Sequence, residues 1–171
     1  MRIAVAIGEG WELSAEAEQA QAFHWFRVSP RAALEVAVLS DAPVWYTGHF
    51  VEGRMWPCAG EGCRLCAEGI GTQVRFVLAV CELSTRRVGL LEMGRSNGLA
   101  VRDWCGRNGG LKGMVLEFYK HSKASTSRTE VSYIDRLPPP WVYAMPVPEV
   151  RKALVNTWVK AKMPVPKGLG V

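Results

Sequence analysis

The amino-acid sequence predicts a mainly β protein that has one helix among its strands and a metal-binding loop after the first strand. Two observations support this prediction. Between residues 43 and 137, β-branched and aromatic side chains fall into five short runs, with one helical pattern between the third and the fourth. Between residues 49 and 66 the chain holds one histidine and three cysteines among glycines. The 171 residues are enough for one domain with extensions and a hydrophobic core.

Three strands are expected before the helix. Residues 44–51 are rich in β-branched and aromatic side chains and lead directly into the metal-binding loop. Residues 73–83 alternate apolar and polar side chains over part of their length, and residues 88–93 follow a polar turn at 84–87. These three segments therefore predict a strand, an inserted loop and a hairpin.

One helix and two further strands complete the pattern. The helix is expected over residues 97–107, with Ser96 as its N-cap and the Asn-Gly-Gly sequence at 108–110 as its stop. Residues 113–121 and 128–134 alternate as strands on either side of a polar turn. Strand, strand, strand, helix, strand, strand is the element order of the OB-fold, a Greek-key barrel that binds oligonucleotides in many proteins. We therefore predict a five-stranded OB-fold barrel with an inserted zinc-binding loop.

Two extensions flank the predicted OB domain of residues 43–137. Residues 1–42 carry three basic and six acidic side chains, with a helix-forming composition at 15–26 and a short strand pattern at 34–39. Residues 138–171 begin with three prolines, which cannot join a central strand, and carry five basic side chains and one acidic one. Within this tail, residues 148–162 fit a basic amphipathic helix.

The metal-binding loop carries the most specific signal in the chain. The four candidate ligands are His49, Cys58, Cys63 and Cys66. Eight, four and two residues separate them, so little loop entropy opposes their closing around one ion. Cys₃His is a standard ligand set of structural Zn²⁺, and four such ligands leave no open position for a catalytic water. The sequence therefore predicts a structural Zn²⁺ site. His24 and His121 are the alternatives to the histidine ligand.

Enzyme signatures are missing from the sequence. Zinc deaminases combine His-x-Glu with Pro-Cys-x-x-Cys, but here Glu52 follows His49 by three positions and the thiol after Cys58 comes too late. No P-loop, G-x-S-x-G or H-E-x-x-H motif occurs. We therefore expect that the protein is not an enzyme. A metal-dependent nuclease or deaminase is the alternative hypothesis.

The composition indicates an intracellular, cytoplasmic protein. Five cysteines, of which three belong to the metal motif, argue against a disulfide framework. No apolar run approaches the roughly 18–20 residues of a membrane span, and the first residues are a weak match to a secretory signal.

Charge and aromatic residues indicate a nucleic-acid partner. Residues 43–137 carry thirteen basic and nine acidic side chains, so the positive charge lies in the middle and the tail of the chain. Single strands bind where Lys and Arg alternate with aromatic side chains on which bases stack. The candidates are Trp45, Arg54, Trp56, Arg75, Arg87, Tyr119, Lys120, Lys123 and Arg128. We expect Phe76, Trp104 and Phe118 in the core instead, because they follow the apolar faces of their elements.

The chain resembles phage-type single-stranded-DNA-binding proteins, which are OB-fold proteins with an inserted His/Cys₃ zinc subdomain. The four candidate ligands carry the match, together with residues 113–120 and 127–132, which look like the last hairpin of such folds. The resemblance implies Zn²⁺, single-stranded DNA and a role in replication or recombination of a phage or mobile element. Members of this class commonly end in an acidic tail, whereas this tail is basic and suits an anion or an acidic protein surface. The alternative is a zinc-containing adaptor subunit of a mobile-element or defence nucleoprotein complex.

Overall fold

The structure is a computed structural model that describes residues 24–124 and 128–166. The strands are β1 (His24–Phe26), β2 (Leu34–Val38), β3 (Val44–Val51), β4 (Arg54–Pro57), β5 (Thr72–Glu82), β6 (Val88–Gly94), β7 (Val115–Lys120) and β8 (Thr129–Ile134). The helices are α2 (Arg64–Ala67), α3 (Arg95–Asn108) and α4 (Val150–Lys160), with a 3₁₀ turn η1 (Pro140–Ala144). The prediction of a mainly β fold is confirmed. Each of the five strands and two helices expected from residue 43 onward is present within two residues of its predicted ends.

The eight strands form one mixed sheet. Its main path is β1-β6-β5-β2-β7-β8, and β3 pairs with both β5 and β4. Only β1 and β6 pair in parallel; the other named ladders are antiparallel. Within the described residues no ladder joins β6 to β8, so the sheet is not closed into a barrel and the predicted OB-fold is not confirmed. The free edge of β6 pairs instead with β1. This close pairing requires glycine at position 89, because a Cβ there would lie 2.9 Å from the carbonyl carbon of His24.

The N-terminal strands belong to this sheet. β2 matches the strand pattern at residues 34–39 and lies between β5 and β7, on the N-terminal side of the boundary expected at residue 43. Along β5 it is continued by β3, since Val38 faces Val80 and Val44 faces Val77. Within the expected helical stretch at 15–26, the described residues 24–26 form β1 instead of a helix, and residues 15–23 lie outside the described part.

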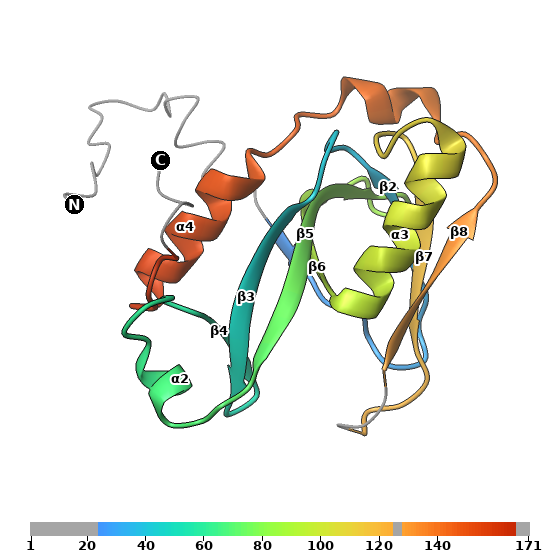
Figure 1. The fold of residues 1–171 in the computed structure, drawn as a ribbon. Helices are drawn as coiled ribbons and strands as arrows, with labels where there is room; N and C mark the ends of the chain where they lie inside the picture. The colour runs from blue at the N-terminus through green and yellow to red at the C-terminus, as the bar shows by residue number, and fades with distance from the viewer. Residues whose placement is uncertain (1–23, 125–127, 167–171) are drawn as a thin grey trace, which may run out of the picture.

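Two apolar layers cover the two faces of the sheet. Figure 1 shows α3 and α4 on opposite sides of the strands. One layer contains Val36, Leu78, Val80, Leu91, Val101 of α3 and Phe118. The other contains Ala37, Tyr46, Val77, Ala79, Leu90, and Leu154 and Trp158 of α4. Because residues 77–81 are buried on both faces, the middle of β5 reads as a continuous apolar run, without alternation.

Helix α3 begins and ends as its local sequence allows. The N-cap is Gly94, two residues before the expected Ser96, and no side chain caps this end. The predicted stop is confirmed, because Gly109 adopts a left-handed conformation with φ 76° at the C-cap. Gly98 weakens the helix by propensity, but it lies against the ring of Phe76 on β5, where a Cβ would come within 2.6 Å of the ring atom Cε2. The glycine is therefore required by packing between the helix and the sheet.

The three aromatic residues that were expected in the core all belong to the apolar layer under α3. Phe118 is 1% exposed, while Phe76 and Trp104 are partly buried and pack against the same layer. Among the described helices, none is long and apolar enough to cross a membrane.

Candidate metal centre and adjoining groove

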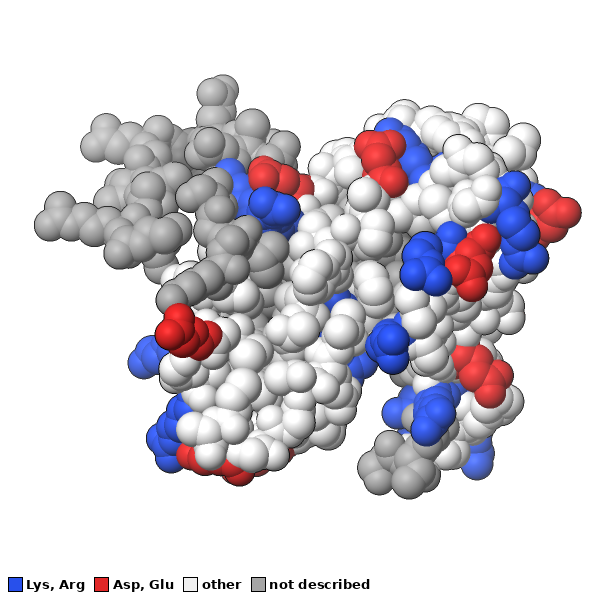
Figure 2. Space-filling view, viewed as in Figure 1, with Lys and Arg blue, Asp and Glu red and all other residues white. Residues whose placement is uncertain are grey.

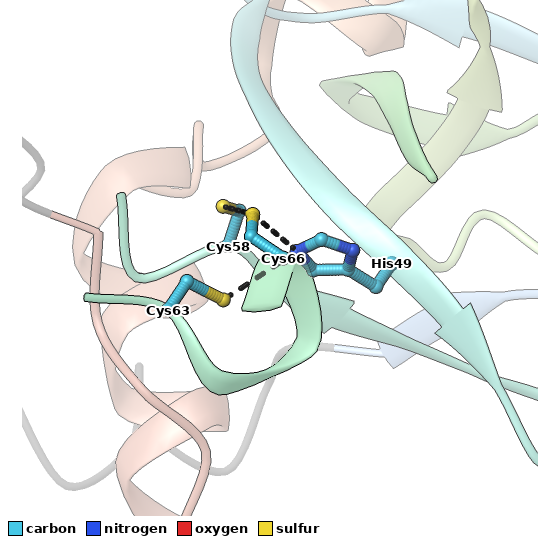
Figure 3. A group of neighbouring side chains, drawn as sticks. All are labelled: His49, Cys58, Cys63 and Cys66. Atoms are coloured by element: carbon cyan, nitrogen blue, oxygen red, sulfur yellow. Dashed lines mark hydrogen bonds between the residues drawn. The ribbon is translucent and has the colours of Figure 1, made fainter. Parts of the chain in front are cut away.

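The four predicted ligands converge at the end of the β3–β4 hairpin. His49 lies in β3, Cys58 follows β4, Cys63 is the N-cap of α2 and Cys66 is within that helix. Figure 3 shows their side chains pointing toward one another, and their ligand atoms all lie within 4.8 Å of each other. The sequence prediction that these residues form one cluster is therefore confirmed.

The spacing of the ligand atoms fits a tetrahedral metal ion. His49 Nε2 is 3.5 Å from the sulfur of Cys63 and 3.5 Å from that of Cys66, and the sulfurs of Cys58 and Cys66 are 3.6 Å apart. With metal–sulfur bonds of about 2.3 Å and metal–nitrogen bonds of about 2.0 Å, a tetrahedron places two sulfurs about 3.8 Å apart and a sulfur and a nitrogen about 3.5 Å apart. The pair Cys58–Cys66 is far longer than a disulfide of about 2.05 Å. The four side chains are thus compatible with a metal site.

Short-range backbone contacts shape the loop that presents the thiols. Gly60 has φ 80°, which favours glycine, and its N–H donates to the sulfur of Cys58 at 3.5 Å. The N–H of Cys63 then donates to the carbonyl of Gly60 at 3.0 Å. On the other side, Gly48 allows close pairing of β3 with β4, because a Cβ there would meet the carbonyl oxygen of Trp56 at 2.8 Å. Local sequence therefore determines most of the geometry of the cluster.

His49 is oriented by a hydrogen bond on the far side of its ring. The side chain is fully buried, and Nδ1 lies 2.9 Å from the carbonyl oxygen of Ile70. That carbonyl can only accept, so Nδ1 carries the proton and Nε2 offers its lone pair to the cluster. The two alternative histidines lie elsewhere: His121 contacts Glu130 and His24 contacts Arg87.

The pKa values of the cluster reflect its crowded thiols. Backbone hydrogen bonds from Cys66 and Ala59 lower the pKa of Cys63 to about 6. Hydrogen bonding to Cys58, together with burial, raises the pKa of Cys66 to about 11, because a second thiolate beside the first is disfavoured. Burial lowers the pKa of His49, but its hydrogen bonds to Cys58, Cys63 and the Ile70 carbonyl outweigh burial, so the net shift is upward. A divalent cation bound to the cluster would displace the remaining thiol protons and balance the charge of the thiolates.

A groove of about 1440 Å³ begins at the same hairpin. One wall is formed by the β3–β4 hairpin and the first residues of β5, and the opposite wall by β7 and β8. The junction of β6 with α3 lies between them, while β1 and α4 complete the lining. Figure 2 shows the surface hollowed between the two lower lobes, with lysine and arginine side chains at the mouth of the hollow.

The groove is lined by an excess of positive charge. Its basic lining residues are Arg27, Arg54, Arg75, Arg95, Lys120 and Arg128. Glu92 is the one acidic residue among the described residues that line it, and it accepts a 2.7 Å hydrogen bond from the hydroxyl of Tyr46. Burial and the neighbouring carboxylate raise the pKa of that tyrosine. The groove can therefore attract an anion along its length.

Four of the nine predicted nucleic-acid residues line this groove, namely Arg54, Arg75, Lys120 and Arg128. The other five, which lie outside its lining, are Trp45, Trp56, Arg87, Tyr119 and Lys123. Trp45 is 62% exposed, whereas Tyr119 packs edge-on against His121 and Arg87 bonds to His24.

The groove also contains residues that sequence reasoning missed. Phe50 lines it and is 54% exposed, which makes it an accessible aromatic face. Its signal was the alternation of β3, which places it on the face opposite His49. Arg27 and Arg95 had no recognisable signal, because each belongs to a segment that only the tertiary structure brings to the groove.

Comparison of the chain with protein-family models, curated proteins and solved structures finds no match, so the function has to be inferred from the site itself.

Proposed function

We propose that this protein binds single-stranded nucleic acid, preferably DNA, in the groove between the β3–β4 hairpin and the β7–β8 hairpin. The observation that carries the proposal is the charge of this groove, which six basic side chains and one acidic side chain line among the described residues. Phosphates along the strand would bind these cations and release counterions, while a base stacks on Phe50.

The topology supports an OB-like scaffold for this binding. Taken together, β2 and β3 run along β5 as one interrupted first strand, and β5-β6-α3-β7-β8 follow in the OB order. The pairing of β2 with β7 and of β7 with β8 also follows that fold. We propose an open variant of this architecture, in which β1 pairs with the edge of β6 that β8 would occupy in a closed barrel.

The start of α3 adds to the attraction for phosphate. Its first turn contains no acidic side chain, and Gly94, Arg95, Ser96 and Asn97 line the groove. The N-terminal end of a helix carries a partial positive charge from its unpaired N–H groups. This end therefore reinforces the arginines around it.

We further propose Zn²⁺ as the ion of the metal centre, in a structural role. Three thiolates and one imidazole suit a borderline-soft ion, and they fill a tetrahedral shell. The ion would fasten the chain after β4 to β3 and so fix the hairpin that carries Phe50 and Arg54. Its binding energy would thus contribute to folding of the groove wall.

An oligonucleotide titration tests the proposed function. Fluorescence anisotropy with a labelled oligo-dT, repeated at increasing KCl, should give an affinity that falls with a log–log slope of about 0.7 per phosphate neutralised. Arg54→Gln should weaken binding and lower that slope, whereas the control Arg64→Gln, on α2 outside the groove lining, should leave both close to the wild type. Absence of binding at low salt, or binding that salt does not weaken, would exclude the proposal.

A protein–protein adaptor is the second candidate. The segment between β8 and α4 exposes Leu137 at 85%, Tyr143 at 58% and Val147 at 49%. Exposed apolar side chains in one short stretch suit a partner protein. A failure of the oligonucleotide titration would favour this function.

A further inference from the structure

We infer that Glu92 is a positioning residue that holds Arg75 in place for a phosphate of the bound strand, and that α4 supports it through Tyr46. The inference rests on the proposed function and names the side chains that prepare the groove before the strand arrives. It concerns the one carboxylate that the described part of the chain contributes to the lining, where a negative charge would be expected to repel the strand.

The contacts around Glu92 form a chain that runs from the helix to the groove. Trp158 of α4 packs edge-on against the ring of Tyr46, with centroids 5.0 Å apart, and both side chains are 3% exposed. The Tyr46 hydroxyl donates to Glu92 Oε2 at 2.7 Å. The other oxygen, Oε1, lies 3.6 Å from Nε of Arg75. The carboxylate is thus held on one side by a buried hydroxyl and faces the guanidinium on the other.

Arg75 is held in place but keeps hydrogen-bonding capacity. Its Nη2 donates to Gln73 Oε1 at 2.9 Å, and the guanidinium passes beside Gly94, where a Cβ would come within 3.2 Å of Nη1. Its Nε is the one buried side-chain nitrogen or oxygen in the described residues that has no hydrogen-bond partner. Because this buried Nε faces the Glu92 carboxylate, a phosphate oxygen that enters from the groove would bind the Nη side of the planar guanidinium.

These contacts predict that Glu92→Gln weakens binding of the strand, whereas charge repulsion alone predicts that it strengthens binding. If Glu92 only repelled the strand, Glu92→Gln would strengthen binding, because it removes a negative charge from a cationic groove. If Glu92 orders Arg75, the same change lets the guanidinium move freely in the unbound protein. The side chain then has to lose that conformational freedom when the strand binds, which costs affinity. The expected result is weaker binding by roughly three- to tenfold, which is about what it costs to immobilise one long side chain on binding.

A double-mutant cycle with labelled oligo-dT tests the inference. Arg75→Gln should weaken binding roughly tenfold and reduce the salt slope by about 0.7, since one phosphate contact is removed. Glu92→Gln should cause little further loss in the Arg75→Gln background. The matched control is Glu68→Gln, which removes the same charge on α2 outside the groove lining and should leave binding unchanged or slightly stronger.

A spectroscopic readout separates positioning from a change in stability. In ¹H–¹⁵N spectra of arginine Nε, the wild-type Arg75 resonance should be sharp and slow to exchange, and both Glu92→Gln and Tyr46→Phe should broaden it or speed its exchange. Tyr46→Phe keeps the ring against Trp158 and removes only the hydroxyl. Stronger binding by Glu92→Gln, additive effects in the cycle or an unchanged Arg75 resonance would overturn the inference while the proposed function stands. No binding by the wild-type protein would overturn both.

Discussion

Replacing Gly98 by alanine should destabilise the protein, although alanine is the better helix former. In a helix interior this replacement normally gains about 0.8–1.0 kcal/mol. At Gly98, however, the new methyl group would lie 2.6 Å from Cε2 and 2.8 Å from Cγ of Phe76, where ordinary carbon contacts need about 3.5–4.0 Å. Because Cδ2 of Phe76 would be closer still, either the ring or α3 has to move by more than about 1 Å, and such overpacking costs about 1–3 kcal/mol.

Gly106 provides a control in the same helix. A Cβ there meets nothing within 4 Å, so Gly106→Ala should gain the propensity term alone. The free energies of unfolding of the two variants, measured by urea denaturation, should therefore differ by about 1–3 kcal/mol with Gly98→Ala the less stable. Because both substitutions share the same propensity, this difference isolates the clash with Phe76. A Gly98→Ala variant as stable as Gly106→Ala would show that the helix does not pack on the ring as described.

Three further predictions concern the metal centre. Cys63→Ser should lose the bound ion, detected by native mass spectrometry, and weaken oligonucleotide binding, whereas Cys105→Ser, outside the cluster, should retain the ion; an intact metal content in Cys63→Ser would contradict the ligand assignment. In metal-free protein the ultraviolet absorbance of thiolate should rise as the pH passes about 6, and Cys63→Ser should remove this step, because the pKa values of Cys63 and Cys66 are about 6 and about 11. Since folding depresses the pKa of Cys63 from about 9, its contribution to the stability of the metal-free protein is present above pH 9 and is lost as the pH falls through about 6. A titration step near pH 6 that Cys63→Ser leaves unchanged would refute this assignment.

How far the sequence predicts the structure depends on the range of the contacts involved. The metal cluster was predictable because its ligands lie within 18 residues and its loop turns on local glycine conformations. The end of α3 was predictable for the same reason, because it depends on the left-handed conformation of Gly109 itself. The start of that helix was misplaced, because Ser96 suits an N-cap by type while packing of β6 against its neighbours sets the first turn at Arg95.

The barrel was not predictable, because closure depends on which strand takes the free edge of β6. A three-residue strand at His24–Phe26 holds that edge, in a stretch whose composition favours a helix. Tertiary pairing overrides such a weak local preference. The same applies to β2, whose strand pattern was recognised but whose central place between β5 and β7 was not.

By itself the sequence determined the five strands expected after residue 43, the cluster of one histidine and three cysteines, and the overall excess of positive charge, since each depends on neighbours a few positions away. Only the tertiary structure decided which cations share a groove. Arg54 and Arg75 on one wall meet Lys120 and Arg128 on the other because the pairing of β2 with both β5 and β7 brings the two hairpins together. The same folding places Trp158 of the C-terminal helix against Tyr46, so that the helix expected in the basic tail supports the face of the groove.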